Sequence, residues 1–435
     1  MQRRHFLKNV AAHMLTLSAT HPVWAMGEKQ GGESYGMHSS SETVITQLGG
    51  MSLEDMRAFH YKEINEEYLP MWDDRRIDWD YGGFRPYLNE DGTYQRPNKE
   101  MYYLGRGIWV FSYLYKHFGK NKRHLEAARK TIDFIYRYCR DENGYWVSEV
   151  TREGKLIQGS FNIYGDIYVA LGLGEYYKAT GDAKARDGAI ETAYGVSKRI
   201  VSPDYMHLAG HGAGNEPGTK RLGTWQHFLN ALTPLARYTD DYGVNMIARM
   251  CVNNILDRHW HPELGVCFEQ LDDMFQPYRP DSTRNNRGIS GWHSIQAAWM
   301  CMEDALRLGN KDRFMTAMEM GRCTLETCWV DGKNGGESGL DSLSNPEAKP
   351  QITSGYSATG ALDDAMVYAL LTIEHTHAPW AVDWFNKIFK VTYQHPERLV
   401  RVCLLHHPRR LFFVIDILNR IIEREGKISN FLEVA

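Results

Sequence analysis

The sequence lacks three features that would each indicate a particular class of protein. These are an excess of basic residues, a long apolar run beyond its first residues, and paired cysteines. Its 50 lysine and arginine residues face 54 aspartate and glutamate residues, which gives a formal net charge of -4. This balance argues against nucleic acid as a partner. No stretch after residue 25 holds 18 uninterrupted apolar residues, so we expect no membrane span in the mature chain.

The first 25 residues predict an exported protein. Arg3-Arg4-His5-Phe6-Leu7-Lys8 resembles a twin-arginine export signal, an apolar run follows over 10–19, and Val23-Trp24-Ala25 fits a cleavage site. We therefore expect a signal peptide over 1–25, a flexible linker over 26–45, and a periplasmic or otherwise exported mature protein. A short basic amphipathic helix is the alternative for the first segment.

The seven cysteines are scattered along the chain without a Cys-x-x-Cys pair. Proteins that take the twin-arginine route fold in a reducing cytoplasm before export. We therefore expect these cysteines to be buried apolar side chains rather than a disulfide framework.

Helical periodicity dominates the rest of the chain, and long strand patterns are missing. About twelve segments show it, arranged in pairs, with longer loops after every second helix. Six helix pairs predict an all-α fold, an (α/α)6 barrel with a central cavity, as one catalytic domain over 46–435. A right-handed solenoid of helix pairs is the alternative. The predicted helices are 53–69, 101–118, 122–140, 161–180, 184–200, 224–240, 243–259, 291–308, 311–328, 360–375, 379–394 and 408–424.

Two histidines are predicted to lie in the first turn of helices that line the barrel. Ser290 stands three residues before His293, as an N-cap would, and Thr224 stands three residues before His227. An imidazole that stays neutral near physiological pH can act as a general base. Burial as an ordinary core histidine is the alternative for each.

A third histidine and an arginine stand out for their surroundings. His406 and His407 come before Pro408, a residue suited to the first helical position, so both histidines are predicted to precede a helix. Arg106 interrupts an apolar helical face, where a guanidinium needs an acidic or oxyanionic partner. A solvated loop is the alternative for His407, and a structural salt bridge is the alternative for Arg106.

Four segments of the chain resemble the N-acylglucosamine 2-epimerase family, which includes cellobiose 2-epimerases and aldose–ketose isomerases. Their order and spacing hold over roughly residues 50–425, and a weaker match covers His227-Phe228-Leu229-Asn230-Ala231. The four segments are Tyr81-Gly82-Gly83-Phe84 with Asn89-Glu90-Asp91-Gly92, Arg106-Gly107-Ile108-Trp109, Gly291 to Trp299, and His406-His407-Pro408-Arg409.

The resemblance implies an (α/α)6 barrel that acts on a mono- or oligosaccharide, with His293 and His406 as the acid/base pair. A base would remove the proton next to the sugar carbonyl, and a nearby cation would stabilise the resulting enediolate. This route needs no metal or cofactor, and the protein is expected to be a monomer or homodimer. The residues expected to bind the substrate are Arg106, His227, Trp109, Trp292, Tyr81, Gln296, Asn230 and Asp364.

The chain departs from the family pattern at two carboxylates. Gln296 and Asn230 stand where the family has glutamate, and a neutral amide supports an imidazolium less well than a carboxylate does. The family's Trp-Trp-x-Gln-x-Glu stretch survives only in the acidic character of Asp364. Another acid, such as Asp364, would have to compensate for the two amides.

Two other functions stay open on the sequence. The first is a glycoside hydrolase on the same barrel, which needs two carboxylates flanking the scissile bond. The second is a non-catalytic sugar-binding relative, which the two amides make credible. The acids that could serve a hydrolase are Asp166, Glu269, Asp363 and Asp364.

Overall fold

The computed structural model describes most of the chain beyond residue 43. The described residues are 44–72, 75–89, 91, 93–202, 218–279, 288–332, 338–348, 356–394 and 403–432. The predicted signal peptide and nearly all of the predicted linker lie outside them. Val44–Ala435 forms one compact unit by its internal contacts. Within the described residues, no helix has the length and apolar character needed to cross a bilayer.

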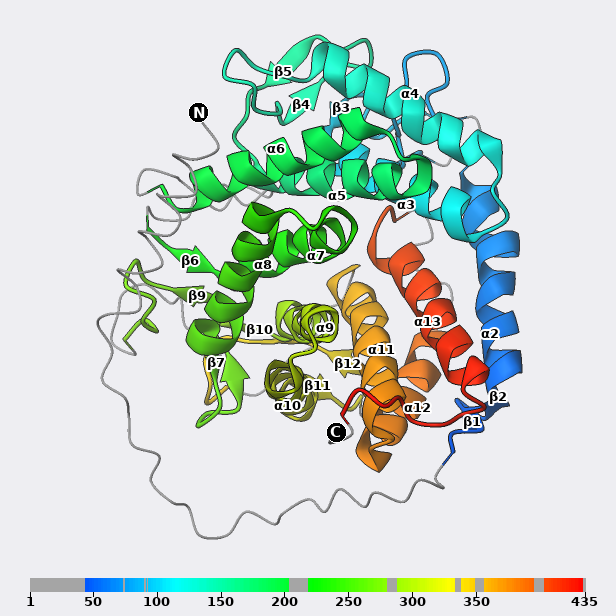
Figure 1. The fold of residues 1–435 in the computed structure, drawn as a ribbon, viewed down its shortest axis with the longest axis vertical. Helices are drawn as coiled ribbons and strands as arrows, with labels where there is room; N and C mark the ends of the chain where they lie inside the picture. Colours follow the sequence, from blue (N-terminus) through cyan, green and yellow to red (C-terminus); the bar gives the residue numbers. More distant parts are fainter. Residues whose placement is uncertain are drawn as a thin grey trace. The chain divides into compact units, whose positions relative to one another are not determined.

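Twelve α-helices in the described part of the chain form two concentric rings (Figure 1). Six inner helices pack each on the next in chain order: α3 (Met101–His117), α5 (Ile163–Thr180), α7 (Leu222–Thr239), α9 (Gly291–Leu308), α11 (Tyr356–Thr376) and α13 (His406–Glu423). Five outer helices each pack on the inner helix before them: α4 (Lys122–Tyr138), α6 (Ala183–Ile200), α8 (Tyr242–Asn254), α10 (Lys311–Cys328) and α12 (Pro379–Gln394). The sixth, α2 (Leu53–Lys62), packs on α13.

Aromatic contacts close the inner ring between its first and last helices. The Tyr113 ring of α3 stacks on Phe412 of α13, with ring centroids 4.9 Å apart. The Tyr113 hydroxyl also donates a hydrogen bond to Asp416 of α13. A solenoid would leave its terminal repeats apart, so this contact confirms the predicted (α/α)6 barrel and excludes the solenoid alternative.

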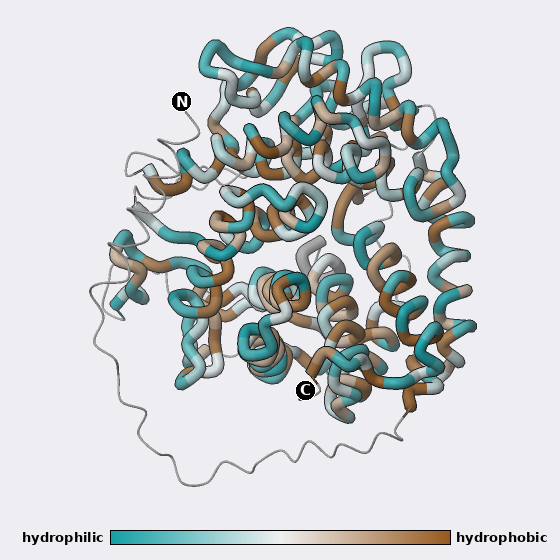
Figure 2. The backbone as a smooth tube through the Cα atoms, viewed as in Figure 1, coloured by the Kyte–Doolittle hydropathy of each residue, from teal (hydrophilic) through white to brown (hydrophobic). Residues whose placement is uncertain are grey.

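The two rings differ in how far their helices are buried. Outer helix α4 has one apolar stripe, seen in Figure 2 as alternating teal and brown positions, whereas inner helix α5 is buried over most of its length. Gly105 and Gly172 allow α3 and α5 to approach closely. A Cβ on Gly105 would lie 2.4 Å from the Tyr168 carbonyl carbon, and one on Gly172 would lie 2.5 Å from the Gly105 oxygen. Backbone contact therefore fixes α3 against α5.

Short antiparallel strands precede three of the inner helices. β3 (Lys99–Glu100) leads into α3, β6 (Lys220–Arg221) into α7 and β10 (Ile289–Ser290) into α9. Each pairs with a strand distant in sequence, and these pairs set where the inner helices begin. The strand pairings are β3 with β4 (Glu149–Val150) and β4 with β5 (Leu156–Gln158); β6 with β9 (Gln270–Leu271); β10 with β13 (Ser342–Leu343); β1 (Gln47–Leu48) with β2 (Met51–Ser52); β7 (Trp260–His261) with β8 (Val266–Cys267); and β11 (Trp329–Val330) with β12 (Gly339–Leu340).

Two predicted helices continue past their α-helical part as turns of other helix types. α2 runs on into the π-helix η1 (Glu63–Tyr68) and the 3-10 helix η2 (Leu69–Met71), and α8 runs on into the π-helix η3 (Ile255–His259). The seven cysteines are all free, six of them buried and Cys323 partly exposed, which confirms their predicted apolar role.

Of the three helix starts predicted beside the candidate histidines, two are wrong and one is confirmed. Ser290 caps α9 as predicted, and its hydroxyl accepts from the His293 amide at 3.1 Å. Thr224 is no cap, because α7 begins at Leu222 and His227 is its sixth residue. α13 begins at His406, so His406 lies inside the first turn, and Pro408 is tolerated because first-turn amides have no partner within the helix.

Candidate active site

A chain of contacting side chains runs across the N-terminal ends of the inner helices. Arg106 of α3 contacts Tyr168 of α5, and the Tyr168 ring meets the His227 ring of α7 at 5.8 Å. The His227 and His293 ring centroids are 5.7 Å apart. Trp292 then links His293, at 6.3 Å, to His406 of α13, at 4.7 Å. The structure thus gathers the three predicted histidines and the arginine at one end of the barrel.

His293 forms a dyad with a carboxylate. Its Nδ1 lies 2.8 Å from Glu269 Oε2. Burial alone would raise the pKa of Glu269, but His293 and then Arg221 beside it hold that pKa below its ordinary value, so Glu269 is ionised near neutral pH. An ionised carboxylate accepts a hydrogen bond from the Nδ1–H group. The lone pair of the neutral ring is then on Nε2. His293 is therefore oriented as a base.

Glu269 reaches His293 through the short strands that precede the inner helices. Its carbonyl accepts from the Leu222 amide at 2.9 Å, and its amide donates to the Gly288 carbonyl at 2.9 Å. Arg221↔Gln270 pairing between β6 and β9 sets this register. Glu269 is thus held by backbone on both sides.

Gly223 of α7 lies directly against the dyad. A Cβ at this position would lie 3.0 Å from His293 Cε1, 3.1 Å from His293 Nδ1 and 3.3 Å from Glu269 Oε1. The Gly223 carbonyl also accepts from His227 Nδ1 at 2.5 Å. Glycine here lets His293 and Glu269 pack closely against α7.

We expect Gly223→Ala to lower catalytic activity with little loss of stability. The added methyl displaces the His293 ring by a few tenths of an ångström, and misplacements of this kind reduce rates strongly. Gly174→Ala is the matched control, since its Cβ would meet Leu235 Cδ1 at an ordinary 3.4 Å. Steady-state rates and thermal melts of both variants test this, and equal rates in the two would contradict the prediction.

Asp364 of α11 is the acceptor at the centre of a buried network. Its Oδ2 accepts from Trp292 Nε1 at 2.9 Å and from Gln296 Nε2 at 2.6 Å. Its Oδ1 accepts from Arg409 Nη2 at 2.5 Å and from Trp299 Nε1 at 3.1 Å. The Asp364 side chain is 1% exposed. Five side chains therefore depend on this one carboxylate, because His406 also contacts it.

His406 is the histidine that Asp364 positions. Its Nδ1 lies 3.2 Å from Asp364 Oδ2 and 3.2 Å from Gln296 Nε2. Burial lowers the pKa of His406 to about 4, although the hydrogen bond to Asp364 opposes this. Burial raises the pKa of Asp364, but Arg409 and His406 outweigh that effect and hold it well below its usual range. His406 is thus a neutral imidazole beside an ionised carboxylate at pH 7.

His227 is suited to binding rather than to proton transfer. Burial, together with the nearby His293, lowers its pKa well below the ordinary value. Its Nδ1 donates to the Gly223 carbonyl, so the neutral ring offers Nε2 as an acceptor. A neighbouring hydroxyl group could donate to it.

Arg106 is held between two tyrosines. Its guanidinium carbon lies 3.7 Å from the Tyr102 ring centroid and 4.1 Å from the Tyr168 ring centroid. Its Nη2 donates to the Tyr168 hydroxyl at 2.7 Å and to the Tyr102 hydroxyl. Arg106 is 2% exposed, and both tyrosines that hold it are neutral groups. Aromatic faces stabilise the cation and keep its charge near the histidines.

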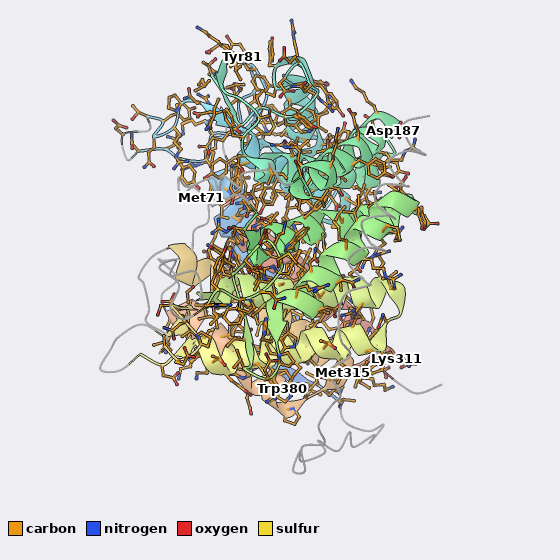
Figure 3. All side chains as sticks on the ribbon, turned by 90° about the vertical axis from the view of Figure 1, so that its left-hand side faces the viewer. Met71, Tyr81, Asp187, Lys311, Met315 and Trp380 are labelled. Carbon is orange, nitrogen blue, oxygen red and sulfur yellow. The ribbon has the colours of Figure 1, made fainter. Side chains whose placement is uncertain are left out.

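Three residues predicted to bind the substrate lie outside this group. Trp109 and Asn230 lie about a turn deeper, where they line a cavity in the C-terminal half of the barrel. Tyr81 is 43% exposed at the top of Figure 3, and its ring faces Arg152 at 5.0 Å and Lys99 at 5.6 Å. The prediction for Tyr81 therefore has no support from geometry.

The glycine motif next to Tyr81 has a packing role instead. Gly82 has φ +85°, and a Cβ there would lie 2.3 Å from the Lys130 carbonyl oxygen. Phe84 packs on Gly107 of α3, where a Cβ would meet its ring at 2.1 Å. The motif therefore seats the loop against α3 and α4, which fixes the helix that carries Arg106.

The four acids named for a hydrolase are all engaged by cations or histidine. Asp166 pairs with Arg199 at 2.5 Å, and Asp363 pairs with Arg410 at 2.6 Å. Asp364 pairs with Arg409, and Glu269 with His293. None of the four stands as one of two unpaired carboxylates across a cleft, so this set gives the hydrolase hypothesis no support.

Two concentric rings of helices define an (α/α)6-barrel protein, and histidines, carboxylates and an arginine gather at one end of it. A sequence model of the N-acylglucosamine 2-epimerase (GlcNAc 2-epimerase) family matches residues 82–398. This match covers more than half of the chain, and the chain belongs to that family.

Individual relatives are distant. The N-acylglucosamine 2-epimerase of Mus musculus is 25% identical over 256 residues, which cover 56% of this chain and 59% of the mouse protein. The cellobiose 2-epimerase of Dictyoglomus turgidum is 22% identical over 287 residues, which cover 62% of this chain and 70% of that protein. The matched part of this chain thus spans about three fifths of the mouse relative's length.

Similarity to a solved structure extends over nearly the whole barrel. The cellobiose 2-epimerase of Spirochaeta thermophila matches with a TM-score of 0.69 and 19% identity, over 85% of this chain and 98% of that one. At this identity the match establishes the fold, and the fold is that of the predicted barrel.

Proposed function

We propose that this protein is a sugar 2-epimerase or aldose–ketose isomerase that works by histidine acid/base proton transfer. The observation that carries the proposal is that His293 and His406, on different inner helices, each contact a carboxylate, the partly buried Glu269 and the buried Asp364. Each imidazole is thus oriented by a partner that also stabilises its protonated form. The residues gathered at this end of the barrel fit a reaction that moves one proton.

The side chains at this end of the barrel can carry each step of the proposed reaction. One imidazole removes the proton from the carbon next to the carbonyl of the open-chain sugar, and the electron pair moves onto the carbonyl oxygen. Arg106 supplies positive charge near the resulting enediolate, and His227 accepts from a sugar hydroxyl. Return of a proton to the opposite face of the same carbon gives the epimer, and its return to the neighbouring carbon gives the ketose.

A non-catalytic sugar-binding protein is the second candidate, because two family glutamates are amides here. Gln296 donates to Asp364 and lies against His406, so the carboxylate that contacts His406 comes from α11 rather than α9. Asn230 lies deeper, in the C-terminal half of the barrel. A carboxylate still accompanies each imidazole, which favours an active enzyme.

Proton exchange with solvent distinguishes the candidates. In deuterium oxide, an epimerase or isomerase incorporates deuterium at the carbon next to the carbonyl of mannose, N-acetylglucosamine or cellobiose. NMR of the recovered sugar reports both the exchange and the stereochemistry. Binding of all three sugars without exchange would favour the non-catalytic candidate, and cleavage of an aryl glycoside would favour a hydrolase.

The low pKa of His406 predicts an acid-tolerant pH profile. The base must be unprotonated, so activity limited by His406 falls only as the pH drops through about 4, rather than through the ordinary 6.5. Gln296→Glu adds negative charge beside His406 and so raises the pKa of His406. The fall in activity on the acid side of the pH profile then moves to higher pH. Gln276→Glu, at an exposed position, is the control. If the acid side of the pH profile does not move in Gln296→Glu, His406 takes no part in the rate-limiting proton transfer.

We also propose that the chain is exported by the twin-arginine route. The support is the sequence of the first 25 residues. Replacing Arg3 and Arg4 by lysine is expected to retain the full-length chain in the cytoplasm, because this route reads the arginine pair. Fractionation of a bacterial host expressing both forms tests the proposal, and unchanged export of the double variant would refute it.

A further inference from the structure

A cavity lies among the inner helices, deeper than the histidines. Its volume is about 160 Å³, and its walls come from the middle and C-terminal turns of α3, α5, α7, α9 and α13. The active-site groups described above come from the N-terminal halves of inner helices. The two sites therefore share the barrel but use different turns of it.

Three aromatic side chains form the deep end of this cavity. Trp109, Trp299 and Phe413 line it, and the Phe413 ring lies 6.4 Å from Trp109 and 5.6 Å from Trp299. Trp299 also donates its indole N–H to Asp364 on the histidine side. We call these three rings the aromatic floor. Through Trp299 it contacts the carboxylate that positions His406.

Charged side chains of both signs line the rest of the cavity in equal number. Three are acidic and three are basic, so the lining carries no net charge when all are ionised. Arg237 pairs with Glu303 at 3.1 Å, and Arg420 pairs with Glu374 behind it at 2.6 Å. The six lining residues are Glu175, Glu303 and Asp416 with Lys178, Arg237 and Arg420.

Glu175 carries an acceptor oxygen that this lining engages only through a long ion pair with Lys178. The residue is 3% exposed, and its Oε1 accepts no hydrogen bond from the described residues. Lys178 Nζ lies 3.4 Å away and is also 3.1 Å from His117 Nε2. A buried carboxylate oxygen whose one close cation is at 3.4 Å and is shared with a histidine has room for a closer donor, which favours a bound group that donates to it.

We propose that this cavity binds a neutral, polyhydroxylated molecule of about monosaccharide size, at a site distinct from the active site. Balanced charge disfavours an anion or a cation, because either would disturb pairs that are already matched. Acceptors and donors along the wall suit hydroxyl groups, and flat rings at the floor suit the apolar face of a sugar ring. A cavity of about 160 Å³ limits the ligand to a small molecule.

The access route lies at the C-terminal ends of the helices. The Arg237 and Arg420 side chains are 43% and 42% exposed, whereas Trp109 and Trp299 are buried. A ligand would therefore enter past the two arginines and reach Glu175 on its way to the floor.

Calorimetric titration with D-sorbitol tests the proposal. Sorbitol has no carbonyl, so it cannot be turned over at the active site. We expect the wild-type protein to bind sorbitol, Glu175→Gln to bind it at least about tenfold more weakly, as the loss of a hydrogen bond to a charged group implies, and His406→Ala to retain the binding. Glu191→Gln, at an exposed residue paired with Arg140, is the matched control.

A second variant keeps the test independent of the Glu175 charge. Leu171 lines the cavity, and Leu171→Phe should fill it and abolish sorbitol binding while deuterium exchange at the active site persists. Binding that vanishes in His406→Ala, or that survives in both cavity variants, would overturn the proposal. Binding of gluconate or glucosamine tighter than sorbitol would also overturn it. Exchange is measured separately, so failure of the proposed activity leaves this test unaffected.

Discussion

His293→Ala is expected to lower the rate of deuterium incorporation next to the sugar carbonyl by about 10²–10⁴-fold, the range for removal of a general acid or base. The fold should persist, since the His293 side chain is 30% exposed and its hydrogen bond is to one carboxylate. A double variant with Glu269→Gln should be little worse than His293→Ala alone, because Glu269 acts through His293.

Glu269→Gln alone separates positioning from binding. The amide cannot stabilise a protonated His293, so we expect kcat to fall while KM changes little, and the pH profile to shift. Glu263→Gln is the matched control, since His261 Nδ1 lies 3.0 Å from Glu263 Oε1 in an exposed pair. If Glu269→Gln behaves like that control, the dyad has no part in the reaction.

Asp364→Asn is expected to reduce both stability and activity. Breaking one partner of a buried ion pair typically costs about 3–5 kcal/mol, because Arg409 is left with a charge that no carboxylate balances. The variant also removes the anion that contacts His406. Chemical denaturation and deuterium exchange measure the two effects. Asp331→Asn, at a 69% exposed partner of Lys387, should change neither.

A double variant divides these two effects of Asp364. In Asp364→Asn with Arg409→Met, the unbalanced guanidinium is gone, so part of the lost stability should return while activity stays low. Recovery of activity in the double variant would show that Asp364 acts only through the fold. Persistent instability would show that Trp292, Gln296 and Trp299 depend on the carboxylate itself.

The fold could be predicted from the sequence because periodicity of apolar residues marks each helix of a two-ring barrel. All twelve predicted helical segments correspond to helices. The starts of α7 and α13 were predicted two residues late, and neither is capped by a side-chain hydrogen bond. Arg221 precedes α7 and Leu405 precedes α13, and neither residue type indicates a cap. Ser290, which does cap by its hydroxyl, was predictable.

The candidate site could be predicted only in part. The histidines and Arg106 follow from short motifs, but the partner of His293 depends on the two-residue pairing of β6 with β9, which no periodicity reveals. Glu269 was identifiable as an acid worth inspecting, though for a different reaction. Trp109 lies three residues after Arg106 on the same helix face, and sequence spacing does not tell how deep in a barrel each turn lies.

The shared direction of the inner helices has an electrostatic consequence along the barrel axis. Peptide dipoles add within each helix to roughly half a positive charge at its N-terminus and half a negative charge at its C-terminus. The end that holds the histidines therefore favours the negative charge that forms when a proton leaves a sugar. The opposite end favours cations, and Lys178, Arg237 and Arg420 all lie near the C-termini of their helices. The backbone alone thus makes the two mouths of the barrel electrically opposite.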